Sequence, residues 1–201
     1  MRFPRGSYLY HEQMVGDSLH IITSGRVGVW SGGERGRPTL VNTCGPTEML
    51  GELAVLGSEH VRTASVQALT DVTALQFDRR DILAVLERRP RAYLLFVDLL
   101  SQRVQRLTSQ VAEYADLDGS TRIYRHLCRL ADTGLPTGRT TTLPLAQHHL
   151  ASLAGVSLRL ASDVLTAGRA AGLLRTGRGE ITVVDWPGVR RKAGLARRRT
   201  S

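Results

Sequence analysis

The sequence predicts an α+β protein: an antiparallel β-barrel or sandwich comes first, a long helix follows, and a winged helix-turn-helix ends the chain. Three observations support this fold class. Short apolar runs alternate with glycine-rich turns over residues 7–77, apolar residues recur every three or four positions over 93–114, and two helical segments flank a glycine turn at 155–156 before a hairpin. A chain of 201 residues can hold one large domain or two small ones.

The first part of the chain has the pattern of a compact β domain. Apolar runs end at turns such as Ser24 and Gly25, and they lie at residues 19–23, 27–30, 39–42, 64–68 and 73–77. Strands separated by turns every 8–12 residues, roughly, are typical of antiparallel barrels and sandwiches. Residues 78–87 then predict a short helix with acidic residues in its first turns.

Residues 51–64 combine the side chains that a sugar and a phosphodiester require. The Glu52 carboxylate can accept hydrogen bonds from a ribose hydroxyl. Arg62 supplies a planar, charged fork for phosphate oxygens, and Thr63 adds a hydroxyl donor. Gly51 allows a tight turn and a close approach of the backbone to a ligand. The segment therefore predicts a pocket for a sugar phosphate.

Residues 91–116 predict a long helix with the periodicity of a coiled-coil seam. Its apolar residues alternate in steps of four and three, at Tyr93, Val97, Leu100, Val104, Leu107, Val111 and Tyr114. Polar residues fill the outer positions, at Gln102, Arg103, Gln105, Arg106, Ser109 and Gln110. A single buried helix would not keep so narrow an apolar stripe, so the pattern predicts a parallel homodimer. Residues 116–121 then indicate a hinge.

The last part of the chain predicts a winged helix-turn-helix. Its elements are expected at 121–132 (helix), 133–142 (loop), 145–154 and 157–171 (helices) and 173–184 (hairpin). Ser157 is a natural N-cap, because its hydroxyl can accept a hydrogen bond from an amide of the first turn. Small residues and Gly155 allow the two central helices to cross closely. The wing has its tip at residues 177–179.

The charge of the chain is strongly uneven. Residues 1–120 carry 13 Lys and Arg against 14 Asp and Glu, whereas residues 121–201 carry 14 against 4. The second part alone is therefore expected to meet a polyanion, either a nucleic acid or an anionic membrane surface. The helix-turn-helix geometry favours double-stranded DNA, and we expect no membrane partner.

The residues that begin the second helix of this motif are expected to face the bases. They are Ser157, Leu158, Arg159, Ser162 and Asp163. Arg159 can donate two bonds to guanine, Asp163 can accept one from a cytosine amine, and Leu158 can contact a thymine methyl. Further arginines are better placed for phosphates, at Arg169, Arg175, Arg178 and 190–192. The run at 197–199 is interpreted as a solvated basic tail.

The sequence also excludes some classes of protein. It has no apolar run near the ~18 residues of a membrane span, and its start lacks the apolar stretch of a secretory signal, so a cytoplasmic protein is expected. Its two cysteines, Cys44 and Cys128, are interpreted as isolated reduced thiols. A metal enzyme on a cupin-like barrel is disfavoured, since His11, His20 and His60 stand singly and His148 and His149 are expected on different sides of a helix.

The segment Gly51-Glu-Leu53, followed after eight residues by Arg62-Thr-Ala, resembles the phosphate-binding cassette of the cyclic-AMP receptor (CRP/FNR) family of bacterial transcription regulators. The resemblance covers nearly the whole chain in order. It implies a cyclic-nucleotide-binding β-roll over 1–89, a dimerisation helix over 90–117 and a winged helix-turn-helix over 118–201. The pattern from Asp118 to Arg122 is similar to the start of the family's hinge.

The resemblance also implies a mechanism and its partners. Cyclic AMP would act as an allosteric effector at Gly51, Glu52, Leu53, Arg62 and Thr63, and a homodimer would bind a roughly palindromic DNA site. RNA polymerase is an implied partner, with residues 133–142 a candidate contact by position. An iron–sulfur cluster of the kind that some members hold is excluded by the cysteine count.

Two departures from the family pattern bear on specificity. Leu158, Arg159 and Asp163 stand where many members have arginine, glutamate and arginine, so the family's familiar operator is not expected. The adenine-contacting hydroxyl pair of the long helix is Leu107 and Thr108 here. One lost hydrogen bond costs about 1–1.5 kcal/mol, or roughly tenfold in affinity. The alternative is the same DNA-binding dimer acting without a cyclic nucleotide, either constitutively or in response to another signal.

Overall fold

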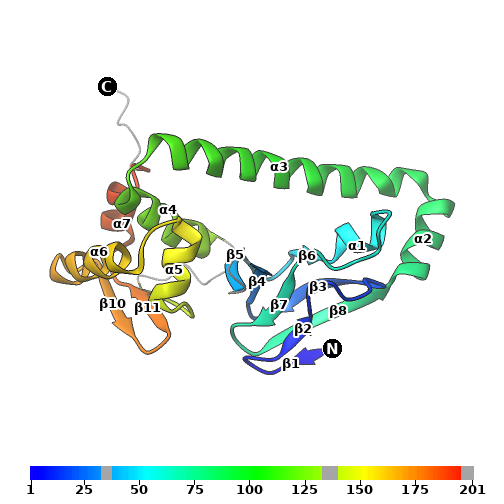
Figure 1. Ribbon diagram of the computed structural model, residues 1–201, viewed down its shortest axis with the longest axis horizontal. Coiled ribbons are helices and arrows are strands. Elements are labelled where there is room, and N and C mark those ends of the chain that lie inside the picture. The colour runs from blue at the N-terminus through cyan, green and yellow to red at the C-terminus, as the bar shows by residue number, and fades with distance from the viewer. Residues whose placement is uncertain (33–37, 133–139, 196–201) are drawn as a thin grey trace.

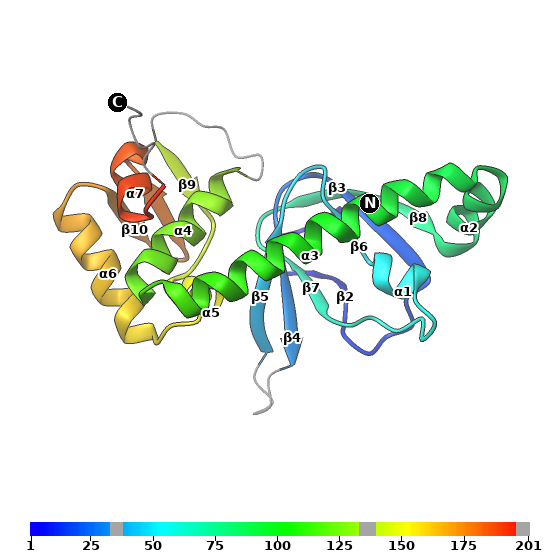
Figure 2. The same ribbon diagram turned by 90° about the horizontal axis from the view of Figure 1, so that it is seen from above.

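A computed structural model describes residues 1–32, 38–132 and 140–195. It confirms the predicted fold class. In Figure 1 a β-roll lies beside the first part of one long helix, α3, and a smaller helical domain with a β-hairpin lies at the other end of that helix. Figure 2, seen from above, shows α3 crossing both parts.

The roll consists of two four-stranded antiparallel sheets. Their strand orders are β1-β8-β3-β6 and β2-β7-β4-β5. The strands are β1 Arg2–Phe3, β2 Tyr8–Tyr10, β3 Ser18–Ser24, β4 Val27–Gly32, β5 Pro38–Cys44, β6 Met49–Leu50, β7 Ser65–Ala68 and β8 Val72–Asp78. Alternating side chains of both sheets form one core, which includes Ile22, Val27, Val66 and Val72.

A short helix, α1 Glu52–Leu56, interrupts the strands. The sequence predicts a loop here, because five residues are too few to show helical periodicity. Gly51 precedes the helix with a φ of 89°, in the left-handed region that glycine adopts without strain.

Three helical segments follow the roll: α2 Arg79–Arg88, the 3₁₀ turn Pro90–Ala92 and α3 Tyr93–Asp116. The predicted long helix therefore begins two residues later than expected. No residue of α3 is buried. Within the predicted stripe, Tyr93, Val97, Val104, Leu107, Val111 and Tyr114 are 44–68% exposed. Apart from Tyr114, which contacts the C-terminal domain, the apolar seam faces away from this chain's own cores.

The C-terminal domain has the predicted helix-turn-helix and wing. Its elements are α4 Gly119–Asp132, β9 Thr141–Leu143, α5 Gln147–Ala154, α6 Leu158–Ala170, β10 Leu174–Gly177, β11 Glu180–Val183 and α7 Trp186–Lys192. The Leu160 amide donates to Ser157 Oγ at 3.2 Å, which confirms the predicted cap. Gly155 makes the turn with a φ of 59°. The third strand of the wing, β9, lies mostly where the sequence predicts a loop, and α7 lies beyond the predicted hairpin.

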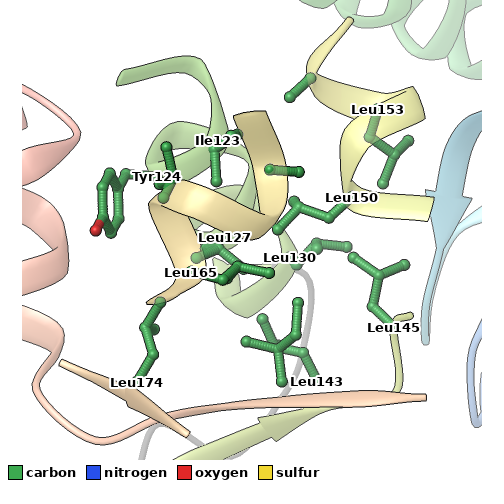
Figure 3. Packing of buried hydrophobic residues seen from close by; sticks show 14 of the residues in the cluster. Ile123, Tyr124, Leu127, Leu130, Leu143, Leu145, Leu150, Leu153, Leu165 and Leu174 are labelled. Carbon is green, nitrogen blue, oxygen red and sulfur yellow. The ribbon is translucent and has the colours of Figure 1, made fainter. Parts of the chain in front are cut away.

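The core of this domain lies where α4, α5 and α6 meet the wing. Figure 3 shows Ile123, Leu127, Leu150 and Leu165 converging there. Leu40, on β5 of the roll, belongs to the same cluster and is 1% exposed. The two domains of this chain therefore share an apolar interior.

Among the described residues no single helix is long and apolar enough to cross a membrane. Only α5 and α6 taken together pass such a test of length and composition, and they are bent by 112° at their break.

Candidate functional site

The predicted cassette residues meet in one small cavity of the roll. Its volume is 40 Å³, and Gly51, Glu52, Leu53, Arg62 and Thr63 all line it. Thr108, the sixth predicted effector residue, is exposed on α3 and does not line it. The structure thus brings five of the six predicted effector residues together in one cavity of a single chain.

Arg62 is a buried cation of this cavity, with only 3% of its surface exposed. Its Nη2 donates to Ser18 Oγ at 3.0 Å, and its guanidinium carbon lies 4.1 Å from the centre of the Tyr10 ring. Nε has no hydrogen-bond partner among the residues that the structure describes. Burial lowers the pKa of Arg62. A buried cation with a spare donor is suited to an anionic ligand.

Gly51 is required beside this arginine. A Cβ atom at position 51 would lie 2.3 Å from Arg62 Nη1, and the left-handed φ would strain any other residue. The glycine therefore allows the backbone and the guanidinium to approach each other.

Glu52 is 2% exposed and forms an ion pair with Arg103 of α3. The sequence places Arg103 among the polar positions outside the apolar seam, where the structure also has it, but the sequence analysis does not predict its partner on the roll. Arg103 faces the roll: Arg103, Arg106, Gln110 and Glu113 recur in steps of three and four on a polar stripe beside the apolar seam, and the two arginines pair with carboxylates of the roll. That second periodicity is the signal that could have identified it.

A larger cleft opens next to the cassette, between α3 and the strands β5 and β6. It has a volume of 530 Å³ and is lined in part by Asn42, Cys44, Glu48, Gln102, Arg103 and Arg106. Arg103 belongs to both cavities. Burial raises the pKa of Cys44 to about 12, so this thiol stays protonated. Neither Leu107 nor Thr108 lines the cleft.

Helix α6, the second helix of the helix-turn-helix, presents a polar face to solvent. Ser157, Leu158, Arg159, Asp163 and Arg169 are exposed, and Ser162 is half-buried. Thr166 lies on the same face and was not predicted; its Oγ1 accepts a hydrogen bond from Arg169 Nη2 at 3.4 Å. This face has the donors and acceptors that read base edges in a major groove.

Basic residues surround this face on neighbouring elements. Arg178 is exposed at the tip of the wing, between β10 and β11, and Arg175 is exposed on β10. The predicted basic run 190–192 lies on α7 and is also exposed. Residues 197–199 and most of the candidate polymerase contact at 133–142 lie outside the described residues.

The described residues contain no group of three or more His, Cys, Asp or Glu side chains arranged to hold a metal ion. The expectation that His148 and His149 point to different sides of a helix is wrong. Their ring centroids are 3.9 Å apart, because both rings lie at the first turn of α5 and the His149 ring packs edge-on against Trp30 of the roll.

The hinge from Asp118 to Arg122 joins the long helix to the helix-turn-helix. Asp118 caps α4, accepting hydrogen bonds from the amides of Ser120 and Thr121 at 2.9 and 3.0 Å. Arg122 donates to Leu117 O at 2.8 Å and to Ala154 O at 3.0 Å. One side chain thus connects the end of α3 with the turn before α6.

A nucleotide-type cassette, a long helix and a basic winged helix-turn-helix together define a DNA-binding transcription regulator. Residues 1–89 match the family described as cyclic nucleotide-binding domain, and residues 121–192 match the Crp-like helix-turn-helix domain. The chain is 31% identical over 166 residues to the CRP-like cAMP-activated global transcriptional regulator of Mycobacterium tuberculosis, covering 81% of this chain and 74% of that protein. The chain belongs to the CRP/FNR family of transcription regulators.

Other relatives agree with this assignment. The cyclic AMP receptor protein of Thermus thermophilus is 28% identical over 181 residues, which cover 90% of this chain and 82% of that protein. The structure of FixK2 from Bradyrhizobium japonicum superimposes with a TM-score of 0.81 at 14% identity, covering 98% of this chain and 96% of that one. At this low identity, the similarity to FixK2 shows the fold alone.

Proposed function

We propose that this regulator is a homodimer that binds a specific DNA sequence and that a cyclic nucleotide such as cAMP, bound in the roll, controls its DNA affinity. The observation that carries the proposal is Arg62, buried at the cassette with an Nε that has no partner among the described residues. The Mycobacterium tuberculosis relative is described as cAMP-activated, which supports the same effector.

In this proposal the cyclic phosphate binds Arg62 and Thr63, and Glu52 accepts a hydrogen bond from the ribose. The cassette cavity is too small for a whole nucleotide. The base therefore extends into the adjoining cleft, and the ligand meets Arg103, which stands between the two cavities. Gly51 and Leu53 complete the cassette.

The apolar seam of α3 is the proposed dimer contact. Its residues are exposed in the single chain and have the spacing of a two-stranded coiled coil. Thr108 lies beside this seam, so a contact from Thr108 to the nucleotide would come from the partner chain. Val104→Glu should give monomers in analytical ultracentrifugation, since it places a charge in the centre of the seam.

On DNA, α6 is proposed to enter the major groove. Ser157, Leu158, Arg159, Ser162 and Asp163 would face the bases, while Arg169 and Arg178 would contact phosphates. Two such helices in a dimer would lie about 34 Å apart, over a roughly palindromic site. We further propose a contact with RNA polymerase and a cytoplasmic location, where bacterial DNA and polymerase reside.

A second candidate function is the same DNA-binding dimer without nucleotide control. Two observations favour it: Glu52 already has Arg103 as its partner, and Leu107 replaces one adenine-contacting hydroxyl. Under this alternative the protein binds its operator with one affinity, whether or not a nucleotide is added.

A calorimetric titration of nucleotide-stripped protein with cAMP separates the two candidates. Nucleotide control predicts about one ligand per subunit and a change in operator affinity on binding. Arg62→Ala should abolish cAMP binding and the change in operator affinity. Arg80 is an exposed arginine of α2, so Arg80→Ala should keep both properties. Operator binding that is tight and indifferent to cAMP in the wild-type protein would establish the alternative.

A further inference from the structure

The cassette helix α1 is held at its carboxyl end by two side chains from outside it. The last carbonyls of a helix have no partner within the helix. Here Val55 O accepts a hydrogen bond from Arg79 Nε at 3.0 Å, and Ala54 O lies 3.3 Å from His60 Nδ1. These contacts matter because a helix of five residues is not stable by itself.

Arg79 and His60 also contact each other. Arg79 Nη2 lies 3.3 Å from His60 Nε2. The neutral imidazole with its proton on Nδ1 satisfies both ring contacts at once: Nε2 accepts from Arg79, and Nδ1 donates to Ala54 O. The two residues and the end of α1 thus form one connected set of hydrogen bonds.

The backbone around these side chains is fixed as well. His60 has a φ of 54°, a conformation that non-glycine residues adopt rarely, and its carbonyl accepts a hydrogen bond from the Gly16 amide at 2.7 Å. The Arg79 amide donates to Asp17 O at 2.7 Å. Such strain persists where the surroundings determine the conformation, often next to a ligand site.

The amino end of α1 is held by the helices that follow the roll, α2 and α3. Arg79 is the first residue of α2, and α2 leads through a single 3₁₀ turn into α3, which carries Arg103 to Glu52. Arginines of α2 and α3 therefore hold the two ends of the cassette helix.

We propose that Arg79 and His60 are positioning residues for the effector. They hold the carboxyl end of α1 so that Glu52 and Leu53, at its start, keep the place in which they meet the ligand. This inference rests on the proposed nucleotide control and adds to it two residues that do not line the cassette cavity.

The test is a calorimetric titration of full-length protein with cAMP. Arg79→Gln removes the Nε bond to Val55 O and the contact with His60, and it should weaken cAMP binding about tenfold. His60→Asn keeps a residue that tolerates positive φ while removing the ring, and it should weaken binding by a smaller factor. The double variant should lose less cAMP affinity than the product of the two single-variant factors, because the two residues share a contact.

Arg80→Gln is the matched control, since Arg80 is the next residue of α2 and is exposed. It should bind cAMP as the wild-type protein does. A positioning role predicts that Arg79→Gln changes the cAMP affinity and speeds amide hydrogen exchange within α1. Its melting temperature should fall by only a few degrees relative to the control, because the two contacts that are lost are part-buried hydrogen bonds, each of which contributes only modestly to stability.

The outcomes separate the two hypotheses. If wild-type protein binds cAMP and Arg79→Gln binds it equally well, the positioning role is wrong and nucleotide control stands. If Arg80→Gln weakens binding as much as Arg79→Gln, the effect is general and the positioning role is also wrong. If wild-type protein binds no cAMP, nucleotide control fails and the positioning role fails with it.

Discussion

The Tyr114 hydroxyl donates a hydrogen bond to the main-chain carbonyl of Leu153 at 3.0 Å and so joins the end of α3 to the end of α5. The ring of Tyr114 also fills the space over the turn, since a Cβ at position 155 would lie 2.6 Å from it. The Arg122 guanidinium lies 5.2 Å from the centre of the same ring. The helix-turn-helix is therefore attached to the long helix through side chains as well as through the chain itself.

Tyr114→Phe should weaken the connection between effector and DNA. It keeps the ring and removes the bond to Leu153, which is worth about 1 kcal/mol. The ratio of operator affinities with and without cAMP should move toward one, as measured by fluorescence anisotropy. Tyr93→Phe, at the opposite end of α3 and equally exposed, should leave the ratio unchanged. Equal effects of both variants would argue against this role for Tyr114.

Arg103→Leu should destabilise the protein more than Arg106→Leu does. The first leaves Glu52 buried without its partner, which costs about 3 kcal/mol. The second breaks the pair between Arg106 and the more exposed Glu48, which is worth less than about 1 kcal/mol. Urea unfolding of the two variants measures the difference. Equal losses would mean that burial of Glu52 does not govern the cost.

Leu40→Ala should lower the free energy of unfolding by about 3 kcal/mol, although it lies outside the helix-turn-helix. Its side chain is part of the C-terminal core, and a cavity would remain there. Val41→Ala, at the next residue of β5 and half-exposed, should cost less than about 0.5 kcal/mol. Limited proteolysis near residue 117 should be faster in Leu40→Ala if the domains separate more often.

Stability should fall as the pH drops from about 6.5 toward 4. Burial lowers the pKa of His20 and of His126 from 6.5 to about 4. Because both imidazoles take up protons on unfolding in this range, the unfolded state binds more protons and is stabilised relative to the folded state as the pH decreases. Each contributes at most about 1.4 kcal/mol per pH unit. His126→Gln should reduce the slope of unfolding free energy against pH; an unchanged slope would contradict the assignment.

Arg159→Ala and Arg178→Ala should affect DNA binding in different ways. Loss of Arg159 should cost about 1–3 kcal/mol at one base pair and relax the preference there. Loss of Arg178 should weaken binding to all sequences and reduce the slope of log K against log salt by about 0.9. Competition assays with single-base operator variants, repeated at several salt concentrations, measure both. A uniform loss for Arg159→Ala would remove it from the base-reading set.

The local chemistry of the sequence was sufficient for features that depend on few neighbouring residues. Ser157 caps α6 as its position before a helix predicts, and the two ends of the cassette, residues 51–53 and 62–63, line one cavity. α7 could also have been found, because Asp185 followed by Pro187 is a helix-start signal, and the Gly188 amide donates to Asp185 Oδ1 at 3.0 Å.

Contacts between distant segments could not be predicted in this way. Arg103 meets Glu52 across 51 residues of sequence, and Arg79 reaches Val55 across 24. Periodicity shows which face of a helix is apolar, but it does not show which part of the chain lies against its other face. Leu40 has the pattern of an ordinary strand residue, and its place in the second core depends on how the domains pack.

The position of Leu40 has a consequence for exchanging DNA-binding domains between relatives. A chimera cut at the hinge would leave Leu40 and Trp30 of this chain facing a foreign surface, while the transplanted α4 and α5 would arrive without the strand that completes their interior. The unit that can be moved intact is therefore discontinuous in sequence: it consists of the helix-turn-helix, the wing and the paired residues Trp30 and Leu40 of β4 and β5.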